Sequence, residues 1–150
     1  MEPYARYRGA LLRKAQRLLG NRADAQDVVQ SLFVDLYAKG EAPELPYLYR
    51  AVTNRCLSLL RDESNRTRLL EAHDDLFRGP VRTRCDDRVI DLDMLMKLAQ
   101  SLDERHLQVL CYRYFDDMSH EEVASMIGLS RKTVQKIVDD IHRTVTELAS

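Results

Sequence analysis

The stretch SHEEVASMIGLSRKTVQKIV, from Ser119 to Val138, meets the geometric requirements of two short helices joined by a tight turn. Ser119 and Glu122 have the spacing of a capping box, in which the serine hydroxyl and the glutamate carboxylate each accept a backbone N–H of the other residue. Gly128 stands at the end of the first helix, where the chain needs a left-handed conformation. Ser130 can then cap a second helix. The stretch therefore predicts a helix-turn-helix.

The apolar residues of this pair are spaced so that two steeply crossing helices bury them against each other. They are Val123, Ala124, Ile127, Leu129, Val134 and Ile137. The polar residues left outside fall in the first two turns of the second helix, where base edges and phosphates are met if that helix enters a DNA major groove. These candidate DNA-binding residues are Arg131, Lys132, Thr133, Gln135 and Lys136. A plain helical hairpin with a solvated charged face is the alternative.

The composition of the 150 residues is that of a globular chain of one domain or two small ones. No apolar run has signal-peptide or membrane-spanning length, so we expect a cytoplasmic location. Cys56, Cys85 and Cys111 lie far apart, with no CxxC pair and no histidine at ligand spacing. We therefore expect reduced thiols, no metal site and no cofactor.

The charge is unevenly distributed along the chain. Residues 1–68 carry a net charge of +4, residues 69–92 carry −2 and residues 93–150 carry −3. A DNA-binding segment is usually the most basic part of a repressor, yet here it lies in the acidic part. Something besides DNA is therefore expected to hold the helix-turn-helix on its target.

The periodicity of the apolar residues predicts helices throughout and no convincing strand, which makes the fold class all-α. The expected helices run from about Pro3 to Leu19, Ala23 to Lys39, about Tyr47 to Asp62, Asp91 to Gln100 and Asp103 to Phe115. The first three can form a small bundle. Their expected inward faces are Tyr7, Leu11, Leu12, Ala15, Leu18 and Leu19; Val28, Val29, Leu32, Phe33, Leu36 and Tyr37; and Leu48, Ala51, Val52, Cys56, Leu59 and Leu60.

The pattern fails from Glu63 to about Asp87, which reads as a mobile linker with at most short helical turns. Two small helical domains, 1–66 and 91–150, are therefore expected on either side of a linker at 67–90. The rear domain is expected to be a four-helix, winged-helix-like helix-turn-helix domain. A second capping box is expected between Ser101 and Glu104.

Three blocks of the sequence, in this order, resemble a known family. They are NRADAQDVVQSLFVDLYAK at 21–39, LPYLYRAVTNRCLSLLRDESNR at 45–66 and LDERHLQVLCYRYFDDMSHEEVASMIGLSRKTVQKIVDDIHRTV at 102–145. The chain resembles a bacterial RNA polymerase sigma factor of the extracytoplasmic-function type. The first two blocks are similar to region two, which docks on the polymerase clamp and reads and melts the minus-ten element. The third is similar to region four, which reads the minus-thirty-five element and binds the flap.

The resemblance implies a dissociable specificity subunit that is not an enzyme. Its partners would be core RNA polymerase, promoter DNA and an anti-sigma factor that holds it inactive. Carried over by motif position, the residues facing the polymerase would be Asp24, Asp27 and Gln30. Those meeting DNA in region two would be Tyr47, Tyr49, Arg50, Asn54, Arg55 and, just beyond, Arg61. Aromatic rings there could stack on an unpaired base while arginines hold phosphates.

The chain departs from the family pattern at several of these positions. Tyr47 stands where a tryptophan is usual, and Asp139 and Asp140 occupy positions at which the family more often has an aromatic or basic residue and an arginine. Two alternatives therefore stay open beside the sigma factor: a free-standing helix-turn-helix regulator, and a sigma-like interaction protein without promoter-opening activity. We expect His106, His120 and His142 to be plain surface residues.

Overall fold

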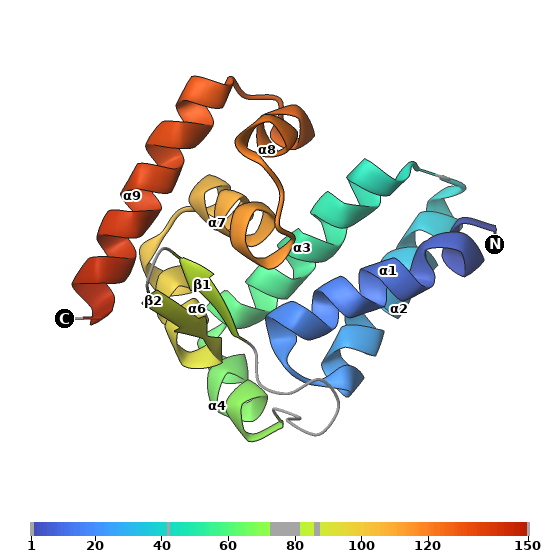
Figure 1. Ribbon diagram of the computed structural model, residues 1–150. Coiled ribbons are helices and arrows are strands. Elements are labelled where there is room, and N and C mark those ends of the chain that lie inside the picture. Colours follow the sequence, from blue (N-terminus) through green and yellow to red (C-terminus); the bar gives the residue numbers. More distant parts are fainter. Residues whose placement is uncertain (1, 42, 73–81, 86–87, 150) are drawn as a thin grey trace. The chain divides into compact units, whose positions relative to one another are not determined.

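The computed structural model describes residues 2–41, 43–72, 82–85 and 88–149. The chain divides into two compact units, Met1–Val81 (the front unit) and Arg82–Ser150 (the rear unit). Helices make up most of both units, which confirms the all-α fold class (Figure 1).

The front unit is built on three helices that pack on one another: α1 (Glu2–Leu19), α2 (Arg22–Lys39) and α3 (Leu45–Arg61). A fourth helix, α4 (Glu63–Ala72), packs against α3 (Figure 1). The side chain of Asn21 caps α2 by accepting the backbone N–H of Asp24 at 2.8 Å. Gly40 ends α2 with φ +71°, a conformation that a residue with a Cβ adopts only at a cost. The predicted three-helix bundle is confirmed.

The core of the front unit consists mostly of the expected apolar residues. Tyr37, however, is 70% exposed, so the prediction that it faces inward is wrong. Leu57 takes a buried place that the periodicity did not assign. Lys14 is also buried, and its Nζ lies 5.2 Å from the centroid of the Tyr49 ring, a cation–π distance. Four further expected core residues are only partly buried: Tyr7, Leu12, Ala51 and Leu59.

The rear unit opens with two short strands and continues with helices. These are β1 (Arg82–Cys85), β2 (Arg88–Asp91), α6 (Leu92–Ser101), α7 (Glu104–Leu110), the π-helix η1 (Cys111–Phe115), α8 (His120–Ile127) and α9 (Arg131–Ala149). α6, α7 and α8 each pack on α9 (Figure 1). The buried face of α9 begins with Val134 and Ile137 and continues through Val138, Ile141 and Val145. α9 therefore exposes the polar side of its first turns and packs its apolar side into the core of the rear unit.

The linker prediction is wrong in two places. Residues 63–72 form the regular helix α4, and residues 82–85 pair with 88–91 as antiparallel strands, with Thr83 opposite Ile90 and Arg84 opposite Val89. Cys85 and Ile90 are buried while Val89 is exposed, so one face of the pair joins the core of the rear unit. The rest of the predicted linker, at 73–81 and 86–87, lies outside the described residues.

The start of α7 also differs from the prediction. Asp103 is the cap, and its carboxylate accepts the backbone N–H of His106 at 2.8 Å. Ser101 cannot form the predicted capping box with Glu104 because it is still the last residue of α6. The predicted continuous helix from Asp103 to Phe115 changes to π-helical geometry at Cys111. Cys56, Cys85 and Cys111 are all buried as thiols.

Candidate nucleic-acid interface

The helix-turn-helix forms through the caps that its sequence predicts. The backbone N–H of Glu122 donates to Ser119 Oγ at 3.1 Å, and the N–H of Ser119 donates to Glu122 Oε1 at 3.0 Å. Gly128 has φ +72° and ends α8. The hydroxyl of Ser130 accepts the N–H of Thr133 at 3.1 Å and so caps α9. These contacts fix the directions in which α8 and α9 leave the turn.

The two helices bury most of the apolar residues assigned to their interface. Val123 and Ala124 of α8 and Val134 and Ile137 of α9 are buried, while Ile127 and Leu129 are only partly covered. All five candidate DNA-binding residues of α9 are exposed: Arg131, Lys132, Thr133, Gln135 and Lys136. The arrangement leaves the first turns of α9 accessible to a DNA groove.

Several of these exposed side chains are held by neighbours within the rear unit. Arg131 Nε lies 3.1 Å from Glu121 Oε1 of α8, and Gln135 Nε2 donates to Asp139 Oδ1 at 3.0 Å. A backbone hydrogen bond and then the charge of Arg131 lower the pKa of Glu121. The recognition face is therefore partly ordered before it meets a ligand.

Asp140 points into a different environment from Asp139. Its carboxylate lies 3.2 Å from His106 Nε2 and also accepts from the guanidinium of Arg143. The hydrogen bond to His106 is the largest cause that lowers the pKa of Asp140. His106 bridges α7 to α9, and His142 bonds the hydroxyl of Tyr114. These two histidines are thus partly buried and bonded within the rear unit, contrary to the expectation of plain surface residues.

The candidate DNA-binding residues of α3 divide into two sets. Tyr47, Arg50, Asn54 and Arg61 recur at spacings of three, four and seven residues, which places them on one stripe of the helix. Tyr47 and Arg50 are exposed, and the other two are partly buried. This stripe, hereafter the α3 stripe, is the part of α3 best placed to meet a nucleic acid.

Tyr49 and Arg55 lie off the α3 stripe. Tyr49 is the residue whose ring lies beneath the ammonium of Lys14. Arg55 donates to Ser31 Oγ at 2.9 Å and to Asp35 Oδ2 at 2.6 Å, both on α2. Arg55 therefore ties α3 to α2.

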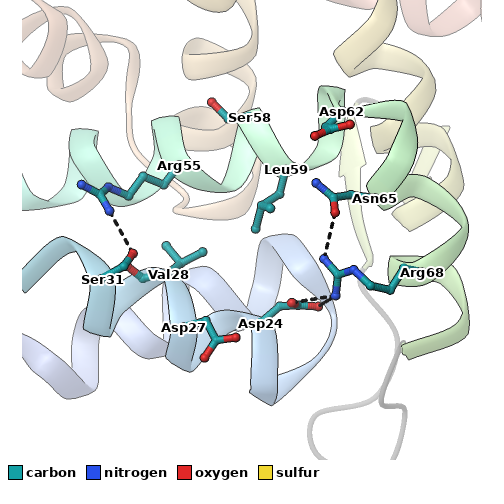
Figure 2. A pocket seen from close by; sticks show the side chains of 10 residues that line it. All are labelled: Asp24, Asp27, Val28, Ser31, Arg55, Ser58, Leu59, Asp62, Asn65 and Arg68. Atoms are coloured by element: carbon teal, nitrogen blue, oxygen red, sulfur yellow. Dashed lines mark hydrogen bonds and ion pairs between the residues drawn. The ribbon is translucent and has the colours of Figure 1, made fainter.

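A groove of about 630 Å³ runs between α2, α3 and α4, and Figure 2 shows its lining. At one end Asp24 accepts from Arg68 of α4 at 2.8 and 2.9 Å and from Asn21 Nδ2 at 2.7 Å. Asn65 accepts from the same arginine at 3.2 Å. The contact between Arg68 and Asp24 becomes evident only in the structure, because a partner 44 residues away leaves no local signal in the sequence.

The three residues expected to face polymerase lie in different surroundings. The side chain of Asp24 is only 12% exposed and belongs to the cluster with Arg68. Asp27 is exposed at the groove, and Gln30 is exposed beside a smaller hollow that Arg8 and Gln26 also line. Asp27 and Gln30 are accessible to a partner, whereas Asp24 is largely occupied within the front unit.

Among the described residues, no group of three or more His, Cys, Asp or Glu side chains could hold a metal ion. None of the helices in the described ranges is long and apolar enough to cross a membrane.

The chain carries a small helical bundle followed in the sequence by a capped helix-turn-helix with an exposed recognition face. This combination is typical of a DNA-binding transcription protein. The family descriptions "Sigma-70 region 2" and "Sigma-70, region 4" match residues 3–66 and 98–145. The RNA polymerase sigma-E factor of Streptomyces coelicolor is 32% identical over 98% of this chain and 82% of its own length. That of Streptomyces antibioticus is 30% identical over 93% and 76%.

The chain belongs to the sigma-70 family and is an alternative sigma factor that directs transcription initiation. Sigma factors are initiation factors and not classical enzymes. A solved structure of the sigma factor RpoE with the anti-sigma factor NepR, from Bartonella quintana, has a similar fold. It has a TM-score of 0.52 and 20% sequence identity and covers 99% of this chain and 94% of its own.

Proposed function

We propose that this chain binds core RNA polymerase and grips a promoter at two points, with region-two functions in 1–66, region-four functions in 91–150 and 67–90 as the connection. The single observation that carries the proposal is the presence of both sigma-70 regions, in order, within 150 residues. The compact units divide after Val81, so α4 belongs to the front unit even though it extends past residue 66.

At the minus-thirty-five element, the first turns of α9 enter the major groove. The exposed Lys132 and Lys136 neutralise phosphates, while Arg131 and Gln135 face base edges. Thr133 lies in the first turn of α9, and its hydroxyl is 2.9 Å from that of Ser130. Support comes from the exposure of this face and from the turn that holds α8 and α9 together.

At the minus-ten element, the α3 stripe meets the separated strand. Tyr47 is 44% exposed and offers a ring on which an unpaired base can stack, and Arg50 lies one turn further along the helix. Tyr49 and Arg55 support the α3 stripe indirectly. Their contacts with Lys14, Ser31 and Asp35 fix α3 against α1 and α2.

In the front unit, Asp27 and Gln30 contact the polymerase clamp, and Asp24 contributes by holding Arg68 in place. The rear unit binds the polymerase flap. An anti-sigma factor that covers these polymerase-binding faces is the partner that would regulate the chain, and the complex would act in the cytoplasm. Support comes from family membership and from the exposure of Asp27 and Gln30.

The test is transcription in vitro with core RNA polymerase, with and without this protein, on a library of promoters randomised at both elements. We expect transcripts from a specific subset of promoters only when the protein is added. A protein that does not bind core polymerase contradicts the proposal. One that binds core polymerase and yields no transcripts is instead a sigma-like interaction protein.

A further inference from the structure

On the exposed face of α9, the side-chain amide of Gln135 is bonded to the carboxylate one turn later. Gln135 Nε2 donates to Asp139 Oδ1 at 3.0 Å, and both residues are exposed. Positions four apart on a helix lie on the same face, so the contact needs no distortion of α9. Gln135 is also one of the base-reading candidates in the second turn.

We propose that Asp139 is a positioning residue that fixes the amide of Gln135 for reading an A·T base pair. This inference rests on the proposed function, in which the first turns of α9 enter the major groove. It gives Asp139 a role in specificity, although a carboxylate on a recognition helix otherwise repels the DNA backbone.

The orientation of the amide follows from hydrogen-bond chemistry. An ionised carboxylate only accepts hydrogen bonds, so the amide NH₂, and not the carbonyl oxygen, must face Asp139. In the proposed arrangement, the N–H on the Cγ side of the amide is the one that donates to Asp139, one turn later in α9. Gln135 Oε1 and the second N–H then form the outer edge. This edge presents one acceptor beside one donor.

Adenine is the base whose major-groove edge complements that pair. It offers N7 as acceptor and N6–H₂ as donor side by side, so the amide N–H donates to N7 and Oε1 accepts from N6. Guanine presents two acceptors, and one of them would oppose Oε1. Thymine offers an acceptor and a methyl group, and cytosine offers only a donor.

Asp140 provides a matched control on the same helix. It carries the same side chain one residue later, but its carboxylate is directed to His106 and Arg143 and does not contact Gln135. Removing either aspartate reduces the negative charge near the DNA backbone by one unit. Only the removal of Asp139 also frees the amide of Gln135.

The experiment applies the randomised promoter library to holoenzyme made with the parent chain and with Gln135→Ala, Asp139→Ala and Asp140→Ala. We expect the parent to prefer adenine at one minus-thirty-five position by roughly fivefold to a hundredfold, and Gln135→Ala to abolish that preference. Asp139→Ala should weaken the preference at the same position by roughly fivefold, whereas Asp140→Ala should retain it.

Unchanged preference at the minus-ten element, together with a melting temperature above that of the assay, shows that a variant is folded and engages the polymerase. The inference is overturned, with the proposed function intact, if Asp139→Ala keeps the preference, or if both aspartate variants shift it equally. It is also overturned if Gln135→Ala changes no position. A parent chain that selects no promoters at all overturns the proposed function along with the inference.

Discussion

The carboxylate of Asp140 lies between the imidazole of His106 and the guanidinium of Arg143, and it joins α7 to α9 within the rear unit. His106 also contacts Asp103 at 2.8 Å, so one imidazole lies between two carboxylates. From the sequence alone, Asp139 and Asp140 are equivalent, because they are adjacent acidic residues on the same helix. The structure separates them because α7 packs against only one side of α9.

This environment predicts an acid-dependent contribution of Asp140 to stability. Because the contacts with His106 and Arg143 lower the pKa of the folded carboxyl, Asp140 stabilises the fold above its unfolded pKa of about 3.9 and loses that contribution as the pH falls through the lower, folded value. Asp140→Asn should therefore lower the urea midpoint at pH 5 and have a smaller effect at pH 3. An equal effect at both pH values contradicts the assignment.

The exposed ring of Tyr47 predicts an effect on promoter opening that a comparison of duplex and already unpaired templates can detect. If its exposed ring stacks on an unpaired base, Tyr47→Ala should reduce transcription from a duplex promoter by roughly fivefold to a hundredfold, since stacking of one base on an aromatic ring contributes about 1–3 kcal/mol. A template already unpaired at the minus-ten element should recover part of the loss, because the protein no longer has to stabilise the opening.

Two substitutions control this prediction. Tyr47→Phe keeps the ring and should keep the activity, whereas loss of activity in this variant would assign the role to the hydroxyl. Tyr37→Ala removes an exposed tyrosine from α2 and should leave the difference between duplex and unpaired templates unchanged. A Tyr47→Ala variant with full activity on duplex promoters excludes stacking at this position.

At the level of elements, the turn between α8 and α9 depends on the conformation of one glycine. Gly128 has φ +72°, and a Cβ placed there meets nothing within 4 Å. The cost of Gly128→Ala is therefore conformational, about 1–2 kcal/mol of unfolding free energy, because the left-handed region is unfavourable for alanine. Gly128→Asn should cost less, since asparagine tolerates this region better.

Equilibrium denaturation of the two variants and the parent measures this difference. Gly9, in the middle of α1, supplies a contrasting site, because a helical glycine replaced by alanine should leave stability unchanged or raise it. If Gly128→Ala is as stable as the parent, positive φ at residue 128 is not required by the turn.

The elements that sequence predicts correctly are those fixed by local signals. The capping box at Ser119, the glycine at 128 and the cap at Ser130 act within four residues of their partners, so the helix-turn-helix is readable from the chain. The strands at 82–85 and 88–91 are only four residues long, and their alternation is too brief to distinguish from a loop. Helix α4 is polar over most of its length, and its contact with α3 becomes evident only in the fold.

The candidate site shows the same division between local and long-range causes. Spacing along α9 correctly predicts which residues are exposed, because helix periodicity alone determines it. The partners of Arg55 and Arg68 lie 20 to 44 residues away in the sequence, and these contacts hold Arg55 against α2 and Asp24 against α4. The residue types of the candidate site can be read from the sequence. Which of these side chains are exposed and which are covered depends on how α2 lies against α3 and α4.

At the level of the whole molecule, charge predicts how binding is shared between protein and polymerase. The net charge is −1, and residues 93–150, which contain the recognition helix, carry −3. Electrostatic attraction to phosphates supplies most of the affinity of a DNA-binding protein for non-specific sites. An acidic rear segment should therefore hold a promoter weakly by itself, with a dissociation constant of roughly micromolar or weaker.

Core polymerase should convert two weak contacts into one tight one. When both units engage the same promoter, the second contact becomes intramolecular, and affinity can rise by roughly a hundredfold to ten-thousandfold without a new contact. Fluorescence anisotropy of a labelled promoter duplex, titrated with the protein alone and with holoenzyme, measures this gain, with core polymerase alone as the control. Because Arg50 and Lys136 lie in different units, Arg50→Ala and Lys136→Ala should each reduce the affinity of holoenzyme, with additive free energies. Nanomolar, sequence-specific binding by the protein alone would contradict this division and favour a free-standing regulator.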